Sequence, residues 1–136
     1  MDQLAKRDDQ PSTKPLLDKL GVKPGMRVTL LDVEEPWFTE LLRERGADVS
    51  TRKRKDTDLV FIKVGRAEEL GRLRSIEPYI KRDGAVWVLT RKGSKSGANQ
   101  NDAMRAGLDA GFVDNKIAAF SETFASIRLV IPVARR

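Results

Sequence analysis

The stretch 20–33, LGVKPGMRVTLLDV, most constrains what this chain can fold into. Pro24-Gly25 is a turn pair, because proline presets one backbone angle and glycine takes a positive φ without a steric clash. Residues 28–33 are nearly all apolar and β-prone. An uninterrupted apolar run of this length is typical of a strand covered on both faces, as in a parallel sheet. We therefore predict a central strand over about 27–33.

The rest of the chain alternates helical and β-prone segments, as a sheet built outward from a central strand requires. We predict helices over about 15–20, 36–45, 66–77 and 101–110, and strands over about 47–54, 57–64, 85–90, 112–120 and 123–133. Asp83-Gly84 is a predicted turn, and Pro78 breaks or kinks the third helix. Asn101 is the predicted N-cap of the last helix. The first strand after the helix over 36–45 has only Val49 as a strong apolar residue, so we place it at a sheet edge.

The last two strands differ in kind from the others, because a short turn joins them directly. In the second of them, apolar residues recur at every other position, which predicts that one face meets the core. The residues predicted on that face are Ala125, Ile127, Leu129 and Ile131. We expect an antiparallel hairpin at the far edge of the sheet. Trp87, in the middle of the strand over 85–90, is a predicted core residue.

The chain of 136 residues is long enough for one domain with a substantial core. We expect residues 1–14, which are polar and of mixed charge, to form a flexible tail, and residues 15–136 to form a single α/β domain. No apolar run approaches the ~20 residues of a membrane span, and the N-terminus carries no apolar signal region. The sequence contains no cysteine, which fits a cytoplasmic protein.

Histidine is also absent, so Ser-His and Cys-His nucleophile pairs and cysteine- or histidine-ligated zinc are excluded. A carboxylate, lysine or tyrosine mechanism stays open. The net charge is +6, and the pI is about 9.8. Such a balance is compatible with nucleic acid or another polyanion as partner.

The loop after the central strand is the first place to look for a ligand site, because open parallel sheets bind ligands outside the carboxyl ends of their strands. Asp32, Glu34 and Trp37 are the candidate cofactor-binding residues there. A dinucleotide or S-adenosylmethionine site normally has glycines in this loop, and residues 34–38 read EEPWF. The favoured interpretation is a helix start, with Pro36 in the first turn and Trp37 as a core anchor.

The loop 91–100, RKGSKSGANQ, is the best candidate for an anion-binding site. Glycines allow tight turns, serines offer hydroxyl groups, and the start of the next helix presents free amides. The candidate residues are Lys92, Gly93, Ser94, Lys95, Ser96 and Gly97, with Arg66 from a neighbouring loop. A solvated loop without a ligand is the alternative. The basic run 52–55 is expected at the same carboxyl edge, and Lys81-Arg82 at the opposite edge.

The order of these motifs resembles a shortened class I methyltransferase from about residue 20 to the C-terminus. LGVKPGMRVTLLDV, TDLVFIKV and EPYIKRDGAVWVLT carry the likeness, with a helix and a hairpin after them. The chain also resembles a family of small bacterial proteins of uncharacterised function, which share the KPG lead-in, the lysine- and serine-bearing loop and an ending like SETFASIRLVI. The resemblance implies a three-layer Rossmann-like α/β fold, with a mostly parallel sheet, a C-terminal antiparallel hairpin and one strand–helix unit missing between Arg54 and Thr57.

The departures from that family lie in the cofactor site. Asp32 matches the family's acid at the end of the first strand, but EEPWF replaces the glycines that follow it. Where the family has an acid for the ribose hydroxyls, residues 52–56 read RKRKD. We therefore predict no cofactor, no metal and no catalytic residue. The favoured function is a non-catalytic binding domain for an anionic ligand or partner. The alternatives are a divergent S-adenosylmethionine-dependent methyltransferase, and an interaction module that forms homo-oligomers through the terminal hairpin.

Overall fold

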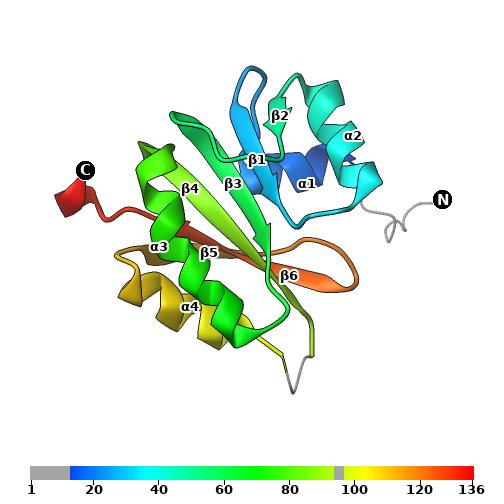
Figure 1. Cartoon of the computed structure of the whole chain (residues 1–136). Coiled ribbons are helices and arrows are strands. Elements are labelled where there is room, and N and C mark those ends of the chain that lie inside the picture. The colour runs from blue at the N-terminus through cyan, green and yellow to red at the C-terminus, as the bar shows by residue number, and fades with distance from the viewer. Residues whose placement is uncertain (1–12, 94–96) are drawn as a thin grey trace.

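The computed structural model describes residues 13–93 and 97–136 and contains one mixed sheet of six strands (Figure 1). The strands are β1 (Arg27–Leu31), β2 (Asp48–Ser50), β3 (Thr57–Lys63), β4 (Ile80–Arg91), β5 (Val113–Ala119) and β6 (Phe124–Val130). Their order across the sheet is β2-β1-β3-β4-β6-β5. The pairs among β1 to β4 are parallel, and β6 is antiparallel to both β4 and β5. The predicted Rossmann-like sheet with a terminal hairpin is confirmed.

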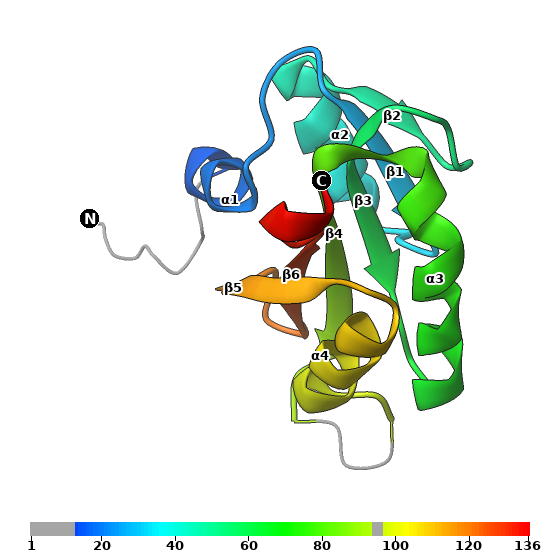
Figure 2. The same ribbon diagram turned by 90° about the vertical axis from the view of Figure 1, so that its left-hand side faces the viewer.

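Helices cover both faces of this sheet, so the fold has three layers (Figure 2). They are α1 (Thr13–Leu20), α2 (Pro36–Arg45), η1 (Ala67–Arg72), α3 (Leu73–Ile76), η2 (Glu77–Tyr79), α4 (Gln100–Asp109) and η3 (Val133–Arg135). The α1 and α2 helices pack on one face, and η1, α3 and α4 pack on the other. Helix α1 begins two residues earlier than predicted, and the rest of the predicted tail lies outside the described residues. No described helix is long and apolar enough to span a membrane.

Trp87 connects the helical layer of α1 and α2 to the sheet. Its side chain is fully buried in the middle of β4, and the indole N–H donates a hydrogen bond of 3.1 Å to the carbonyl of Leu20. Phe61 stacks beside it on β3, with ring centroids 6.4 Å apart. This hydrogen bond satisfies a carbonyl at the end of α1, which has no partner within its own helix. The predicted core role of Trp87 is confirmed.

The edge strand β2 and the connection after it agree with the prediction that one strand–helix unit is missing. β2 lies at the sheet edge, although only three residues of the predicted strand are in regular register with β1. The chain then returns to β3 through residues 51–56 without a helix. A strand–helix unit is therefore missing at the place that the sequence indicated.

Asp83-Gly84 is not a turn between helix and strand, contrary to the sequence prediction. β4 already begins at Ile80, opposite Thr57, and the next paired residues are Leu59 and Ala85, so the chain bulges between them. A Cβ on Gly84 would lie 2.8 Å from the carbonyl oxygen of Asp58. Glycine is needed here because another strand's backbone approaches closely, which local sequence does not reveal.

Three further predictions need correction. The helix predicted from residue 66 is one turn of α-helix between two 3-10 segments, although it does change character at Glu77, as Pro78 predicts. Helix α4 is capped by Asn99, not Asn101. β6 is buried on both faces, since Ser126 and Val130 are buried as well as Ile127 and Leu129 of the predicted core face, whereas Ala125 of that face is half-buried.

Replacing Gly84 by alanine should lower the free energy of unfolding by about 1–3 kcal/mol, because the added methyl group overpacks against backbone that cannot move aside. Chemical denaturation of the variant and the wild type measures the difference. Gly71→Ala is the matched control, since a Cβ there meets no atom within 4 Å. Equal losses in the two variants would contradict this explanation of the bulge.

Candidate functional site

The carboxyl ends of β1, β3 and β4 lie at one edge of the sheet, because these strands are parallel. β1 lies between β2 and β3, so the chain extends the sheet first to one side of β1 and then to the other. The point where the strand order reverses is the usual ligand site of an open α/β sheet. Three loops meet there, after β1, β3 and β4.

Acidic side chains of the loop after β1 are engaged in ion pairs. Asp32 adopts a positive φ of 62°, and its Oδ2 accepts a hydrogen bond of 2.6 Å from Nη1 of Arg72. Glu35 accepts one of 2.8 Å from the Nζ of Lys63. That ammonium also lies 4.6 Å from the centroid of the Phe124 ring. The acid that the methyltransferase resemblance marks is therefore tied to η1 in this structure.

The other two candidate cofactor residues stand at the surface. Glu34 is exposed, and Trp37 is 42% exposed, so the prediction of Trp37 as a core anchor is wrong. The adjacent Phe38 fills the core position instead and is fully buried. Trp37 leans on Phe120, with ring centroids 5.4 Å apart. Helical spacing alone does not predict which of two adjacent aromatic residues is buried, because the buried face of a helix is determined by how the helix packs on the sheet.

The loop after β3 is held by a carboxylate. The Oε1 atom of Glu69 accepts hydrogen bonds from the backbone amides of Gly65, at 2.8 Å, and of Arg66, at 3.2 Å. These bonds, the one from Gly65 foremost, hold the pKa of Glu69 below its ordinary value. The Arg66 side chain points to solvent and pairs with Glu68 at 3.6 Å.

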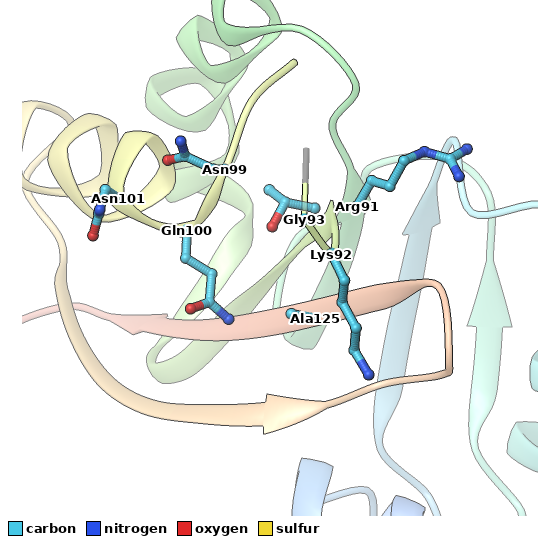
Figure 3. A pocket seen from close by; sticks show the side chains of 8 residues that line it. Arg91, Lys92, Gly93, Asn99, Gln100, Asn101 and Ala125 are labelled. Atoms are coloured by element: carbon cyan, nitrogen blue, oxygen red, sulfur yellow. The ribbon is translucent and has the colours of Figure 1, made fainter. Parts of the chain in front are cut away.

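A pocket of about 390 Å³ lies at the carboxyl end of β4 (Figure 3). It is lined by Thr90, Arg91, Lys92, Gly93, Asn99, Gln100, Asn101 and Ala125. In Figure 3 the side chains of Lys92 and Gln100 extend toward Ala125, whereas Arg91 points away from them. The guanidinium of Arg91 lies instead 5.6 Å from the Phe124 ring. Among the described residues, Lys92 is therefore the cation that this pocket offers to a ligand.

The start of α4 forms one wall of the pocket. The Asn99 side chain accepts a hydrogen bond from the amide of Asp102, and the Asp102 carboxylate accepts one from the amide of Asn99. The amides of Gln100 and Asn101 have no hydrogen-bond partner among the described residues. The first amides of a helix attract negative charge, although the carboxylate of Asp102 offsets part of this field.

Two backbone hydrogen bonds fix the ends of the loop between β4 and α4. The amide of Lys92 donates to the carbonyl of Thr123 at 2.8 Å, and the amide of Ala98 donates to that of Gly65 at 3.2 Å. The first bond ties the loop to the β5–β6 hairpin, and the second ties it to the loop after β3. Lys92 is thus held in place by the neighbouring strands.

Only part of the predicted anion site is brought together. Lys92 and Gly93 line the pocket, whereas Gly97 and Arg66 do not. Ser94, Lys95 and Ser96 lie outside the described residues. The lining residues that were not among the predicted site residues are Thr90, Arg91, Asn99, Gln100, Asn101 and Ala125. The signal for Asn99 was its capping box with Asp102, three residues later. Ala125 joins the pocket through the register of β6 beside β4, which no local signal predicts.

The basic run 52–55 does not lie at this edge, contrary to the sequence prediction. Arg27, at the start of β1, donates to the carbonyl of Lys55 at 2.9 Å. The ammonium of Lys53 lies 5.4 Å from the ring of Tyr79, just before β4. Because β2 is so short, the chain has already returned to the amino ends of the strands. Within the described residues, no three acidic side chains form a group that could hold a metal ion.

The fold is similar to that of S-adenosylmethionine-dependent methyltransferases. An S-adenosylmethionine-dependent methyltransferase from Aquifex aeolicus superposes with a TM-score of 0.65 at 13% identity, over 93% of this chain and 93% of that one. A TehB-like methyltransferase from Corynebacterium glutamicum gives 0.63 at 12% identity, over 88% and 86% of the two chains. A putative type 11 methyltransferase from Sulfolobus solfataricus gives 0.62 at 12% identity, over 87% and 90%.

These likenesses show a methyltransferase-like fold, because at such low identity site residues do not carry over. No model of a known protein family matches the sequence, and no curated protein matches it. The resemblance that the motifs indicated is confirmed at the level of the fold.

Glu69→Ala should destabilise the protein most near neutral pH, and the loss should shrink as the pH falls through the lowered pKa of Glu69. The sign follows from linkage: a carboxyl group whose folded-state pKa is depressed stabilises the native state above its unfolded value, about 4.3, and ceases to do so once protonated. Denaturation of both proteins between pH 7 and pH 3 measures the difference. A loss that is constant across this range would contradict the role of the ionised carboxylate.

Proposed function

We propose that this chain is a non-catalytic Rossmann-like binding domain for a phosphate-bearing ligand, which binds in the pocket at the end of β4. One observation carries the proposal. Lys92 and the first two residues of α4 line the same hollow, and the amides of those two residues have no partner within the described part of the chain. A cation opposite free helix amides is the usual arrangement for holding a phosphate.

The size of the pocket supports a ligand larger than a single ion. Its volume of about 390 Å³ lies within the range of roughly 300–1,000 Å³ that small-molecule sites occupy. Thr90 adds a hydroxyl group at its floor, and Gln100 and Asn101 add amide groups that can donate to phosphate oxygens. The ligand class is therefore a phosphate ester, such as a nucleotide or a short stretch of nucleic-acid backbone.

The loop after β1 supports a function without a methyl-donor cofactor. Its acids Asp32 and Glu35 are paired with Arg72 and Lys63. A cofactor with an adenosine group would need such acids to accept hydrogen bonds from it, and it would need a close backbone approach, whereas residues 34–38 contain no glycine.

Lys92→Gln should weaken binding of a fluorescent oligonucleotide at low salt, about equally for different base sequences, and should reduce the salt slope of the binding constant by about 1, because one phosphate contact is lost. Fluorescence anisotropy between 20 and 200 mM salt, with pyrophosphate as competitor, measures both. Arg74→Gln is the control, since Arg74 is an exposed cation on α3, away from the pocket. The proposal fails if the wild type binds neither probe at 20 mM salt, or if the two variants lose binding equally.

The second candidate is a divergent S-adenosylmethionine-dependent methyltransferase, which the structural neighbours favour because they match over most of this chain. In that case millimolar S-adenosylhomocysteine should raise the melting temperature by several degrees, since a ligand at 100 times its Kd stabilises by about 2.7 kcal/mol. Asp32→Ala should abolish the rise. An unchanged melting temperature in the wild type would remove this candidate.

A further inference from the structure

A second hollow lies on the other face of β6 from the pocket described above. It has a volume of about 220 Å³ and is enclosed by the end of α1 and by the β5–β6 hairpin. Its lining residues are Asp18, Lys19, Leu20, Gly21, Asn115, Lys116 and Arg128. Ala125 of the first pocket and Arg128 of this one are an odd number of residues apart on one strand, so their side chains leave opposite faces.

Arg128 lies in the middle of β6, between β4 and the edge strand β5, and has no counter-charge among the described residues. In the register of the strands it is opposite Trp87 on β4 and Lys116 on β5, and its side chain is half-buried. Among the described residues its only side-chain hydrogen bond runs from Nη1 to Oδ1 of Asn115, at 3.4 Å, and it forms no ion pair. A guanidinium has five N–H donors, and an arginine taken out of water is normally paired. Its remaining N–H donors have no acceptor among the described protein residues and are open to solvent in the hollow, where a ligand can reach them.

The charges around Arg128 are of the same sign. Lys116 is its direct neighbour across the hairpin, and like charges opposite each other in a sheet are destabilising. The Lys116 ammonium donates to the carbonyl of Lys19 at 2.7 Å, which holds it at the end of α1. Burial, and then the charge of Arg136, lower the pKa of Arg128. The arrangement therefore costs stability as it stands.

Among the residues that the structure describes, the single acid that lines the hollow does not neutralise this cluster. Asp18 forms its ion pair with Arg45, at 3.3 Å, and its side chain is 68% exposed. Three cations and one carboxylate line the hollow, so its formal charge of +2 suits a dianion. With about 220 Å³ it is smaller than the roughly 300 Å³ at which drug-sized ligands begin to fit.

We propose that this hollow is a binding site for a phosphate dianion, either inorganic phosphate or the terminal group of a small phosphomonoester, with Arg128 and Lys116 as its main ligands. The planar fork of a guanidinium matches two phosphate oxygens, and the neighbouring ammonium supplies the second charge. Bound phosphate would relieve the repulsion between Lys116 and Arg128 and would accept hydrogen bonds from guanidinium donors that have no acceptor among the described protein residues. The site is separate from the pocket at Lys92 and does not depend on the function proposed for that pocket.

The test is a thermal-melting titration of the whole chain in phosphate-free buffer of low ionic strength. Sodium phosphate should raise the melting temperature of the wild type by several degrees, whereas sodium chloride at equal ionic strength should not. The same titration of Lys92→Gln removes any contribution of the other pocket, and the rise should persist in that variant. In the Lys92→Gln background, Arg128→Gln should abolish the rise, and Lys116→Gln should shift its midpoint to at least tenfold higher phosphate. Methyl phosphate in place of phosphate distinguishes the two sources: a lower midpoint for the ester assigns the site to a phosphomonoester, and a lower midpoint for the free ion assigns it to inorganic phosphate.

Arg128→Gln also separates a binding role from a structural one. Without phosphate this variant should melt at a temperature equal to or higher than that of the wild type, because a half-buried, repelled charge is removed. The proposal is overturned if phosphate and chloride act alike on the wild type. It is also overturned if the phosphate response survives both Arg128→Gln and Lys116→Gln in the Lys92→Gln background, or if Lys92→Gln alone removes it.

Discussion

Burial of β1, β3 and β4 on both faces is the constraint on which the rest of the structure depends. Their side chains supply both hydrophobic clusters, and Trp87 ties the cluster on one side to α1 through the carbonyl of Leu20. A strand covered on both faces has almost no side chain left for a ligand. Polar chemistry is therefore confined to the ends of these strands, to the loops that follow them and to the hairpin at the edge.

The β5–β6 hairpin contributes residues to two separate hollows, one on each face of β6. On one face of β6, Ala125 forms part of the pocket beside Lys92, and on the other Arg128 faces the end of α1. The loop after β1, where a methyltransferase fold holds its cofactor, has its acids paired with cations of β3 and η1. The fold thus keeps the methyltransferase framework, while its open, positively charged hollows lie around β6.

The sequence predicted most of the framework, because the signals for it are local. The apolar run before Val33, and the range of α2 with the left-handed Gly46 that ends it, each report on one segment at a time. The alternation in the last strand located β6 but not its burial, because Ser126 and Val130 on the other face are buried as well. The predictions that failed depended on neighbours far along the chain. β4 bulges at Gly84 because the backbone of β3 approaches closely there, and Phe38, not Trp37, fills the core position. The run 52–55 lies at the amino edge of the sheet because β2 is short.

Periodicity and turn residues by themselves determined that this chain forms a mostly parallel α/β sheet and that the loop after Thr90 carries cations near a helix start. The resemblance of the motif order to methyltransferases indicated that one strand–helix unit is missing. Only the tertiary structure decided which of those cations share a pocket, because the register of β6 beside β4 brings Ala125 to Lys92 and sends Arg91 to Phe124. It also decided that Arg128 and Lys116 are opposite each other. Charges twelve residues apart become neighbours through strand pairing, and pairing is set by the burial of whole faces, which no single stretch of sequence contains.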